Sequence, residues 1–196
     1  MNKLRLRWTG ISPLLMSSAE LINPLSPKTK AIKKITSKRG KTDDDHEQVA
    51  LLEWEFLMYH DSKVGPYIPT ANIKSALIQG GAPRKMGPKM ALAIVDAPNM
   101  KAPLIYDGPR DLDKLRKNID QWSLTVAVVV QRARVMKCRP MFREWAIEFD
   151  VIYDESQVHE DDIIMAAQTA GNIVGIGAWR PKCKGEYGRF KSEVIK

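Results

Sequence analysis

The sequence predicts an α+β protein built around a mostly antiparallel sheet. Three observations support this prediction. Apolar and charged residues alternate near both ends of the chain, in residues 3–8 and 189–195, as is typical of half-buried strands. A segment with apolar residues at helical spacing follows the first strand at 70–78, and a similar one precedes the last strand at 160–170. Further strand-like segments lie between these two helices.

The composition favours one basic, globular domain. The chain has 196 residues, enough for a single domain over 1–196 with its own core. Its formal net charge of +8 favours a polyanion or an anionic surface as partner. Cys138 and Cys183 lack the spacing of a disulfide framework or a zinc site, which fits a reducing cytoplasm. No segment approaches the roughly 20 apolar residues of a membrane span. We therefore expect no cofactor, no metal and no membrane partner.

The first strand is predicted to have one apolar and one strongly basic face. The apolar face is Leu4, Leu6 and Trp8, and the basic face is Lys3, Arg5 and Arg7. Such a basic face suits either a solvated edge strand, where cations discourage pairing with other chains, or contact with nucleic acid. The strand breaks at Gly10 and Pro13.

Residues 24–58 are predicted to form a basic helical insertion. Ser26 and Pro27 suit the N-cap and the first turn of a helix that ends at Gly40. Its candidate nucleic-acid ligands are Lys33, Lys34, Lys38 and Arg39. A second helix opens at Thr42, with three aspartates at its positive end. Because consecutive residues point in different directions around a helix, these aspartates favour a charged first turn over a metal site.

The middle of the chain predicts a helix between short strands. Pro69 holds Ile68 extended, and Thr70 can cap a helix that stops at the run Gly80-Gly81-Ala82-Pro83. The apolar face of this helix is Ile73, Ala76 and Leu77. A basic loop is expected at 84–89, where Arg84 and Lys85 are candidate nucleic-acid ligands. Strands are expected at 91–95 and 104–106, and a short polar helix at 111–118.

Residues 122–136 are predicted to form one long strand that pairs with 145–151 in a long hairpin, with its turn around Pro140. Arg132 and Arg134 continue past the apolar stripe of this strand, toward an expected basic groove. With the insertion set aside, the order of elements is β-α-β-β-α-β. This order predicts the split βαβ arrangement of ferredoxin-like and RRM-like folds.

A glycine-rich run after the last helix is the main candidate site. Aromatic rings beside cations hold single strands of nucleic acid, and glycines would let backbone N–H groups approach phosphates. Trp179 and Tyr187 supply two such rings, and Phe190 is expected to add a third. The alternative is that the aromatic side chains belong to the core and that Arg180 pairs with an acid. The candidate ligands are Gly175, Gly177, Trp179, Arg180, Lys182, Tyr187 and Arg189.

Two motifs resemble those of the repeat-associated mysterious protein (RAMP) superfamily. Residues 67–77, Tyr-Ile-Pro-Thr-Ala-Asn-Ile-Lys-Ser-Ala-Leu, resemble its I-P-x-S-S-L-K-G-A-L-R signature, and the glycine-rich run resembles its C-terminal glycine-rich loop. The chain departs from the family pattern at Ser75, where glycine is usual, and at Ile78, where arginine is usual. The superfamily includes the crRNA-binding backbone subunits of CRISPR effector complexes, and the chain is similar to small bacteriophage proteins of this type.

The resemblance implies a modified RNA-recognition fold that binds single-stranded RNA or DNA without cleaving it. It implies a homo-oligomer along the strand, or a subunit of a ribonucleoprotein, in the cytoplasm of a bacterial host cell if the protein is phage-encoded. Lys74, within the first motif, is a further candidate ligand. Two alternatives stay open. One is a RAMP-type RNA endonuclease with His60 as its catalytic residue. The other is an assembly protein, such as a mimic of a CRISPR subunit or a virion component, whose basic segment docks an acidic partner.

Overall fold

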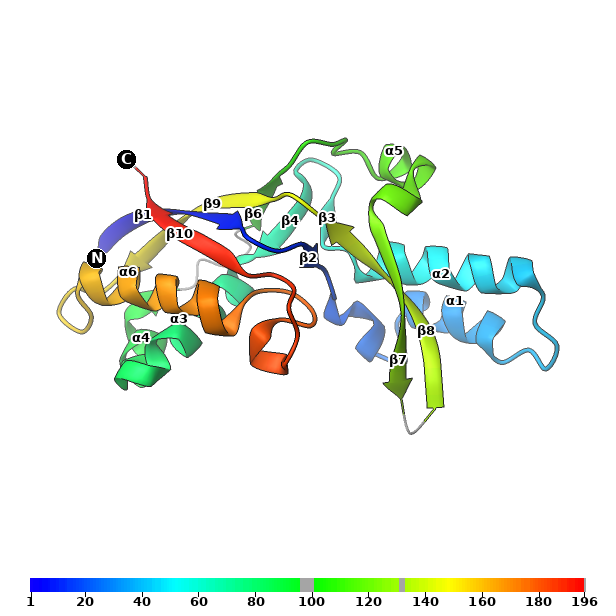
Figure 1. The fold of residues 1–196 in the computed structure, drawn as a ribbon, viewed down its shortest axis with the longest axis horizontal. Helices are drawn as coiled ribbons and strands as arrows, with labels where there is room; N and C mark the ends of the chain where they lie inside the picture. Colours follow the sequence, from blue (N-terminus) through cyan, green and yellow to red (C-terminus); the bar gives the residue numbers. More distant parts are fainter. Residues whose placement is uncertain (96–100, 131–132, 196) are drawn as a thin grey trace.

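The computed structural model describes residues 1–95, 101–130 and 133–195, with side chains placed outside 127–135. It confirms the α+β class (Figure 1). The helices are α1 (Pro27–Thr36), α2 (Asp43–Leu57), α3 (Thr70–Gly81), α4 (Gly87–Ala93), α5 (Leu112–Lys117) and α6 (Glu160–Thr169). The strands are β1 (Asn2–Gly10), β2 (Leu14–Leu15), β3 (His60–Asp61), β4 (Gly65–Pro69), β5 (Ile94–Val95), β6 (Lys101–Ile105), β7 (Ser123–Val130), β8 (Ala133–Phe142), β9 (Ala146–Tyr153) and β10 (Phe190–Val194).

Strand β1 is the second strand from one edge of the main sheet. The strand order of this sheet is β10-β1-β9-β6-β4-β3, and the short strand β5 also pairs with β9. Each of these pairs is antiparallel. Strand β1 pairs with β9 from Asn2 opposite Tyr153 to Thr9 opposite Ala146, and with β10 from Leu6 opposite Val194 to Gly10 opposite Phe190. The two ends of the chain therefore lie side by side in one sheet.

Helices α3, α4 and α6 lie together on one side of this sheet (Figure 1). The apolar face of β1 packs into the core with the inner faces of α3 and α6. Trp8 is fully buried, stacked on Phe190 with ring centroids 4.0 Å apart and edge-on to Phe149 at 4.8 Å. Gly80 lets α3 approach α6 closely, because a Cβ there would lie 2.1 Å from the carbonyl oxygen of Ala166. The predicted face of α3, formed by Ile73, Ala76 and Leu77, is buried as expected.

The basic face of β1 is neutralised by acids on β9. Lys3 pairs with Asp150 at 2.8 Å, and Arg5 and Arg7 both pair with Glu148, at 3.3 and 2.8 Å. The strand is not an edge strand, since β9 and β10 flank it on both sides. The alternating basic residues of β1 thus form cross-strand ion pairs on the outer face of the sheet.

A second sheet has the order β2-β8-β7 and corrects the predicted hairpin. The segment expected as one long strand is two antiparallel strands, paired from Ser123 opposite Pro140 to Val130 opposite Ala133. Strand β9 pairs with β1 instead, and Pro140 is buried inside β8 rather than placed at a turn. The prediction failed because Gln131 and Arg132, which separate the two strands in the sequence, are not turn-forming residues, so the sequence did not show where the chain reverses.

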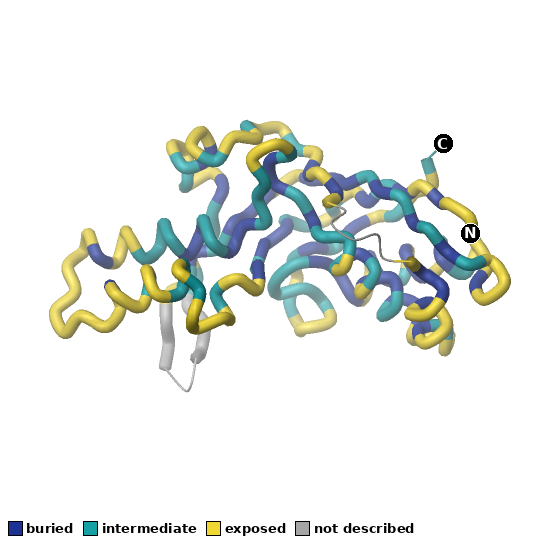
Figure 2. The backbone as a smooth tube through the Cα atoms, turned by 180° about the vertical axis from the view of Figure 1, so that it is seen from behind, coloured by how far each residue is buried: buried dark blue, intermediate teal, exposed yellow. Residues whose placement is uncertain are grey.

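Helices α1 and α2 form an arm that projects from the rest of the molecule (Figure 1). Helix α2 begins with the expected Thr42 cap, and Asp45 completes a capping box by accepting from the Thr42 backbone. The ammonium of Lys38 hydrogen-bonds Asp45 at 2.6 Å, and this contact, with the Thr42 backbone bond, lowers the pKa of Asp45. Figure 2 shows that the outer end of the arm is exposed, whereas its base joins the buried interior.

Two local expectations need smaller corrections. The predicted basic loop at 84–89 is helical from Gly87, where α4 begins with Pro88 in its first turn. The strand expected at 91–95 is confined to Ile94–Val95, because α4 extends to Ala93. Helix α5 lies where the short polar helix was expected, and Asp111 caps it, with its carboxylate accepting from the Lys114 backbone at 3.0 Å. Within the described parts of the chain, no helix is long and apolar enough to cross a membrane.

A buried carboxylate joins the arm to the second sheet. Glu53 of α2 is 3 % exposed, and it pairs with the Lys137 ammonium and accepts from the Cys138 backbone N–H. Partial burial lowers the pKa of the nearby Arg139 guanidinium, and the negative charge of Glu53 opposes this shift. Nearby, the Trp54 indole donates to the Trp122 carbonyl at 2.9 Å. These polar contacts fix the arm against β8.

Replacing Lys137 by methionine should destabilise the protein by about 2–3 kcal/mol, because it leaves the Glu53 carboxylate buried without its ammonium partner. The double replacement Lys137→Met with Glu53→Met should cost less than the single one, since the buried carboxylate is removed together with its ammonium partner. Urea denaturation followed by tryptophan fluorescence measures both. A double variant less stable than Lys137→Met would contradict this account.

Candidate nucleic-acid interface

The glycine-rich segment 171–189 is a compact loop whose backbone packs on itself. Gly175, Gly177 and Gly188 have φ angles of 70°, 83° and 68°, which side chains rarely adopt. A Cβ on Gly188 would lie 1.8 Å from the carbonyl oxygen of Ile176, and one on Gly177 would lie 2.3 Å from that of Leu15. Glycine is therefore required at these positions by backbone-to-backbone contact within the protein.

Several backbone N–H groups of this segment are already bonded inside the protein. Gly175 donates to Ala170 O at 2.8 Å, Gly188 to Pro13 O at 2.8 Å and Gly185 to Arg180 O at 3.1 Å. The expectation that glycine N–H groups of the loop are open to phosphates is therefore wrong for these three residues. The Gly188 bond, together with the bond from the Ala178 N–H to Leu15 O at 2.7 Å, fastens the loop to the residues that follow β1.

A pocket of about 170 Å³ lies between the glycine-rich segment and helix α3. It brings together the two motifs that the sequence analysis singled out, although they are far apart in the chain. Helix α3 contributes one face at the spacing of successive turns, along most of its length. The lining residues are Ser17, Tyr59, Asn72, Ser75, Ala76, Gln79, Val174, Gly175, Ile176, Gly177 and Arg180.

The polar side chains of this pocket are positioned by contacts with one another. The Tyr59 hydroxyl donates to Ser17 O at 3.3 Å, and Asn72 donates to that hydroxyl at 3.5 Å. Gln79 donates to the Ser75 hydroxyl at 2.9 Å. The Arg180 guanidinium donates to Gly177 O at 3.0 Å and is the charged group among the lining residues. The pocket thus combines neutral hydrogen-bonding groups with one fixed cation, a set suited to an anion such as a phosphate.

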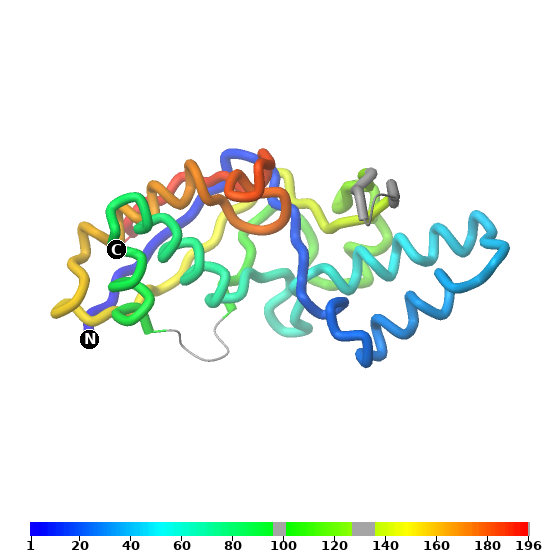
Figure 3. The backbone as a smooth tube through the Cα atoms, turned by 90° about the horizontal axis from the view of Figure 1, so that it is seen from below, coloured from blue at the N-terminus to red at the C-terminus, as the bar shows by residue number. Residues whose placement is uncertain are grey.

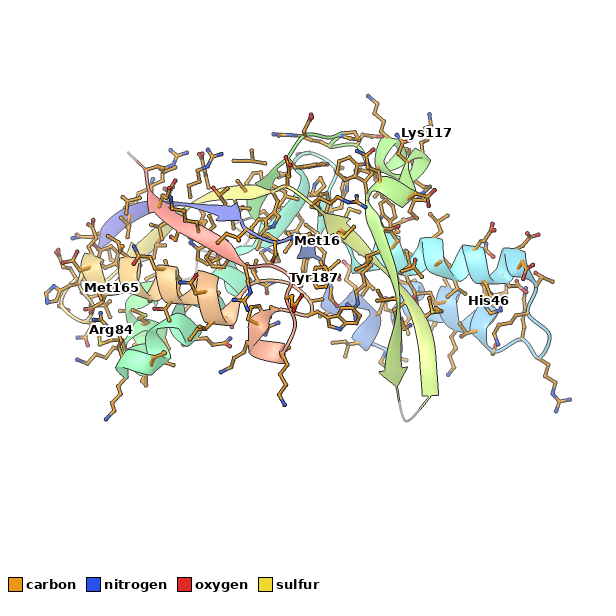
Figure 4. All side chains as sticks on the ribbon, in the orientation of Figure 1. Met16, His46, Arg84, Lys117, Met165 and Tyr187 are labelled. Carbon is orange, nitrogen blue, oxygen red and sulfur yellow. The ribbon has the colours of Figure 1, made fainter. Side chains whose placement is uncertain are left out.

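The aromatic residues of the glycine-rich segment divide into two kinds. Trp179 and Tyr187 are half-buried, with ring centroids 6.2 Å apart, and both leave part of their surface open. Phe190 is buried against Trp8, so its expected role as a stacking platform is wrong. Figure 4 labels Tyr187 near the middle of the view. Two of the three expected rings therefore remain accessible to a base.

The expected cationic side chains of this region differ in their exposure and in their contacts within the protein. Lys182 is exposed on the turn after Arg180. Arg189 is half-buried, and its guanidinium donates to the Asn172 carbonyl. Lys74 lies on α3 and is half-buried, but it does not line the pocket. Arg180 and Lys182 are thus the cations best placed for a strand that follows the loop.

The structure does not bring the other predicted cations to this pocket. Lys33, Lys34, Lys38 and Arg39 belong to the arm, at the opposite end of the molecule from Arg84 and Lys85 (Figures 1 and 4). Arg84 contacts the Met165 sulfur rather than the loop. Arg132 and the Arg134 side chain lie outside the described parts of the chain.

Five polar residues that line the pocket were not predicted from the sequence: Ser17, Tyr59, Asn72, Ser75 and Gln79. Asn72, Ser75 and Gln79 are polar and recur at helical spacing, which marks a second face on α3 beside its apolar one. That pattern was available in the sequence. Ser17 and Tyr59 carried no such signal, because only the fold places residues before and after the arm next to α3.

His60, the candidate catalytic residue, faces elsewhere. Its Nε2 atom lies 2.8 Å from Arg110 O, and His60 does not line the pocket. A hydrogen bond from Lys101 holds the pKa of the neighbouring Asp61 at about 2, so this carboxylate carries no proton to donate at neutral pH. Among the described residues, no group of three or more His, Cys, Asp and Glu side chains is arranged to hold a metal ion.

Comparison with known proteins adds no relative to this picture. No protein-family model matches the chain, and no curated protein matches it.

Replacing Gly188 by alanine should lower the free energy of unfolding by about 2–4 kcal/mol, through left-handed strain and overlap with the Ile176 carbonyl. The matched control is Gly40→Ala, because Gly40 has no neighbour within 4 Å and no positive φ. That variant should be as stable as the wild type, or up to about 1 kcal/mol more stable. Urea denaturation compares the two, and equal stabilities would contradict the assignment.

Proposed function

We propose that the protein binds single-stranded nucleic acid in the groove between α3 and the glycine-rich segment. The observation that carries the proposal is the pocket itself, where both motifs meet around Arg180. Its volume of about 170 Å³ suits a phosphate group rather than a stack of nucleotides. Arg180, Asn72 and Gln79 would hold the phosphate, and an adjacent base would stack on Trp179 or Tyr187.

The proposal includes a fold of the ferredoxin-like, RRM-like type. The strand order β10-β1-β9-β6, with α3 and α6 on one side of the sheet, supports it. The proposed binding mode differs from base stacking on the open face of the sheet. On that face, Arg5, Arg7 and Lys3 are already paired with acids. The strand would instead follow the loop at the end of the helical layer.

The proposed activity is binding without cleavage, in the manner that the RAMP resemblance implies. No described side chain of the pocket is a histidine or a carboxylic acid, the usual general acids and bases of RNA cleavage. A labelled RNA should therefore remain intact during binding. The choice between RNA and DNA would depend on contacts to the 2′-hydroxyl, so both strands belong in the test.

Arg180→Ala should weaken binding of a single-stranded oligomer and flatten its salt dependence. Loss of one phosphate contact should reduce the slope of log K against log salt by about 0.7. Fluorescence anisotropy at several salt concentrations measures both quantities. Lys89→Ala is the control, since Lys89 is exposed on α4, away from the loop, and should leave the slope unchanged. Salt-independent binding by the wild type, or no binding of RNA or DNA, would overturn the proposal.

Two substitutions of opposite charge at one exposed position give a second test. Ser75 lines the pocket and is exposed, so both Ser75→Glu and Ser75→Arg should fold while losing the same bond to Gln79. Glutamate should weaken binding and arginine should strengthen it, each on the order of tenfold, because the added charge faces the phosphate. Affinity changes of the same sign for the two variants would place the strand elsewhere.

A further inference from the structure

A groove of about 850 Å³ opens between the arm and the second sheet, and we call it the arm groove. Helix α2 and the strands β7 and β8 line it, together with α5 and the turn Ile119–Gln121. Helix α1 packs on one side of α2 and the β7–β8 strands on the other, so α1 does not cover this side of α2 (Figure 3). The arm groove shares no lining residue with the pocket of the proposed function. Its volume lies in the range of about 300–1,000 Å³ that is typical of binding clefts.

The floor of the arm groove is apolar. Leu51 of α2 and Ile119 both pack against the core, yet both are only half-buried and keep part of their surface open. Ala50 lies beside Leu51 and is also half-buried, and Cys138 of β8 adds the weakly polar surface of a thiol. Covering this apolar surface would be favourable, because it removes hydrocarbon from water.

The rim of the arm groove is acidic, although the chain as a whole carries a net charge of +8. Asp44, Glu47 and Asp120 are exposed, and no salt bridge joins them to any other residue that the structure describes. Arg116, the one basic residue among the described lining, is already paired with Glu55. The arm groove is therefore a locally negative site on a positively charged molecule.

The α2 wall has the shape of a seat for a second helix. Asp44, Glu47, Gln48 and Leu51 follow one another at the i, i+3, i+4 and i+7 spacing, which places them on one face of α2. This face extends over about two turns, or roughly 10 Å. A helix laid beside it would meet the apolar floor with one stripe of side chains and the acidic rim with the side chains that flank the stripe.

We propose that the arm groove is the docking site for another protein, which inserts a basic amphipathic helix. The aliphatic stripe of that helix would cover Leu51 and Ile119, and its lysine or arginine side chains would pair with Asp44, Glu47 and Asp120. An inorganic cation would use the rim and leave the floor in contact with water. An apolar helix without cations would desolvate the three carboxylates and leave them without partners. Only a partner that is both apolar and basic satisfies floor and rim together.

Three synthetic peptides, each about two heptads long, test these two requirements separately. The leucine–lysine peptide carries leucine on one helical face and lysine on the other. The second peptide has glutamate in place of lysine, and the third has alanine in place of leucine. In isothermal titration calorimetry at low salt, the leucine–lysine peptide should bind at least about tenfold more tightly than either of the others. Its affinity should fall as salt is added. Equal affinity for the alanine peptide or for the glutamate peptide would overturn the proposal.

The variant Glu47→Lys with Asp120→Lys locates the binding site. It reverses two of the three rim charges and should weaken binding of the leucine–lysine peptide by at least about tenfold. The matched control is Asp107→Lys with Glu144→Lys, which changes the net charge equally at two exposed acids outside the groove lining and should bind almost as the wild type does. All four side chains are exposed, so both variants should fold, which circular dichroism checks. Equal losses in the two variants would reduce the effect to net charge and overturn the proposal.

Two further titrations separate the proposal from its rivals. Spermidine supplies cations without a helix, and if it bound as tightly as the leucine–lysine peptide, the occupant would be a small polyamine and the proposal would fail. The variant Arg180→Ala should bind the leucine–lysine peptide as the wild type does, because Arg180 does not line the arm groove. The proposal does not rest on the proposed function, so loss of nucleic-acid binding and loss of peptide binding are independent outcomes.

Discussion

Strand β1 is the element on which the rest of the structure depends, because it joins the two ends of the chain. It pairs with β9 on one side and with β10 on the other. Its residue Trp8 fills the core between Phe149 and Phe190, so the final strand is fixed as soon as the first one is placed. The residues that follow β1 then fasten the glycine-rich segment, through the bonds of Gly188 to Pro13 and of Ala178 to Leu15.

This arrangement changes the role of the glycines. They were expected to expose backbone N–H groups to a ligand, but they allow one stretch of backbone to lie directly on another. The chemistry of the pocket comes instead from side chains, namely Arg180 and the polar face of α3. In our proposal, the tight packing of this loop sets the position of Arg180, the one arginine of the pocket.

The basic excess of the chain is also distributed by the fold. Cations on β1 are paired with acids on β9, where an alternating strand needs partners across the sheet. Unpaired cations remain on α1 and on the turn after Arg180, at separate places in the molecule. The net charge of the chain is therefore divided between the arm and the loop, and only the cations of the loop lie beside the pocket of our proposal.

The sequence by itself determined what depends on neighbours within a turn or two: the alternation of β1, the inner face of α3, and the caps at Thr42 and Asp111. Capping and periodicity are local, so they are written in consecutive residues. The tertiary structure alone decided that β9 pairs with β1, that Phe190 is buried, and that Ser17 and Tyr59 reach the pocket. These outcomes depend on contacts between distant segments, where many pairings satisfy the same alternation and only the packed core selects one.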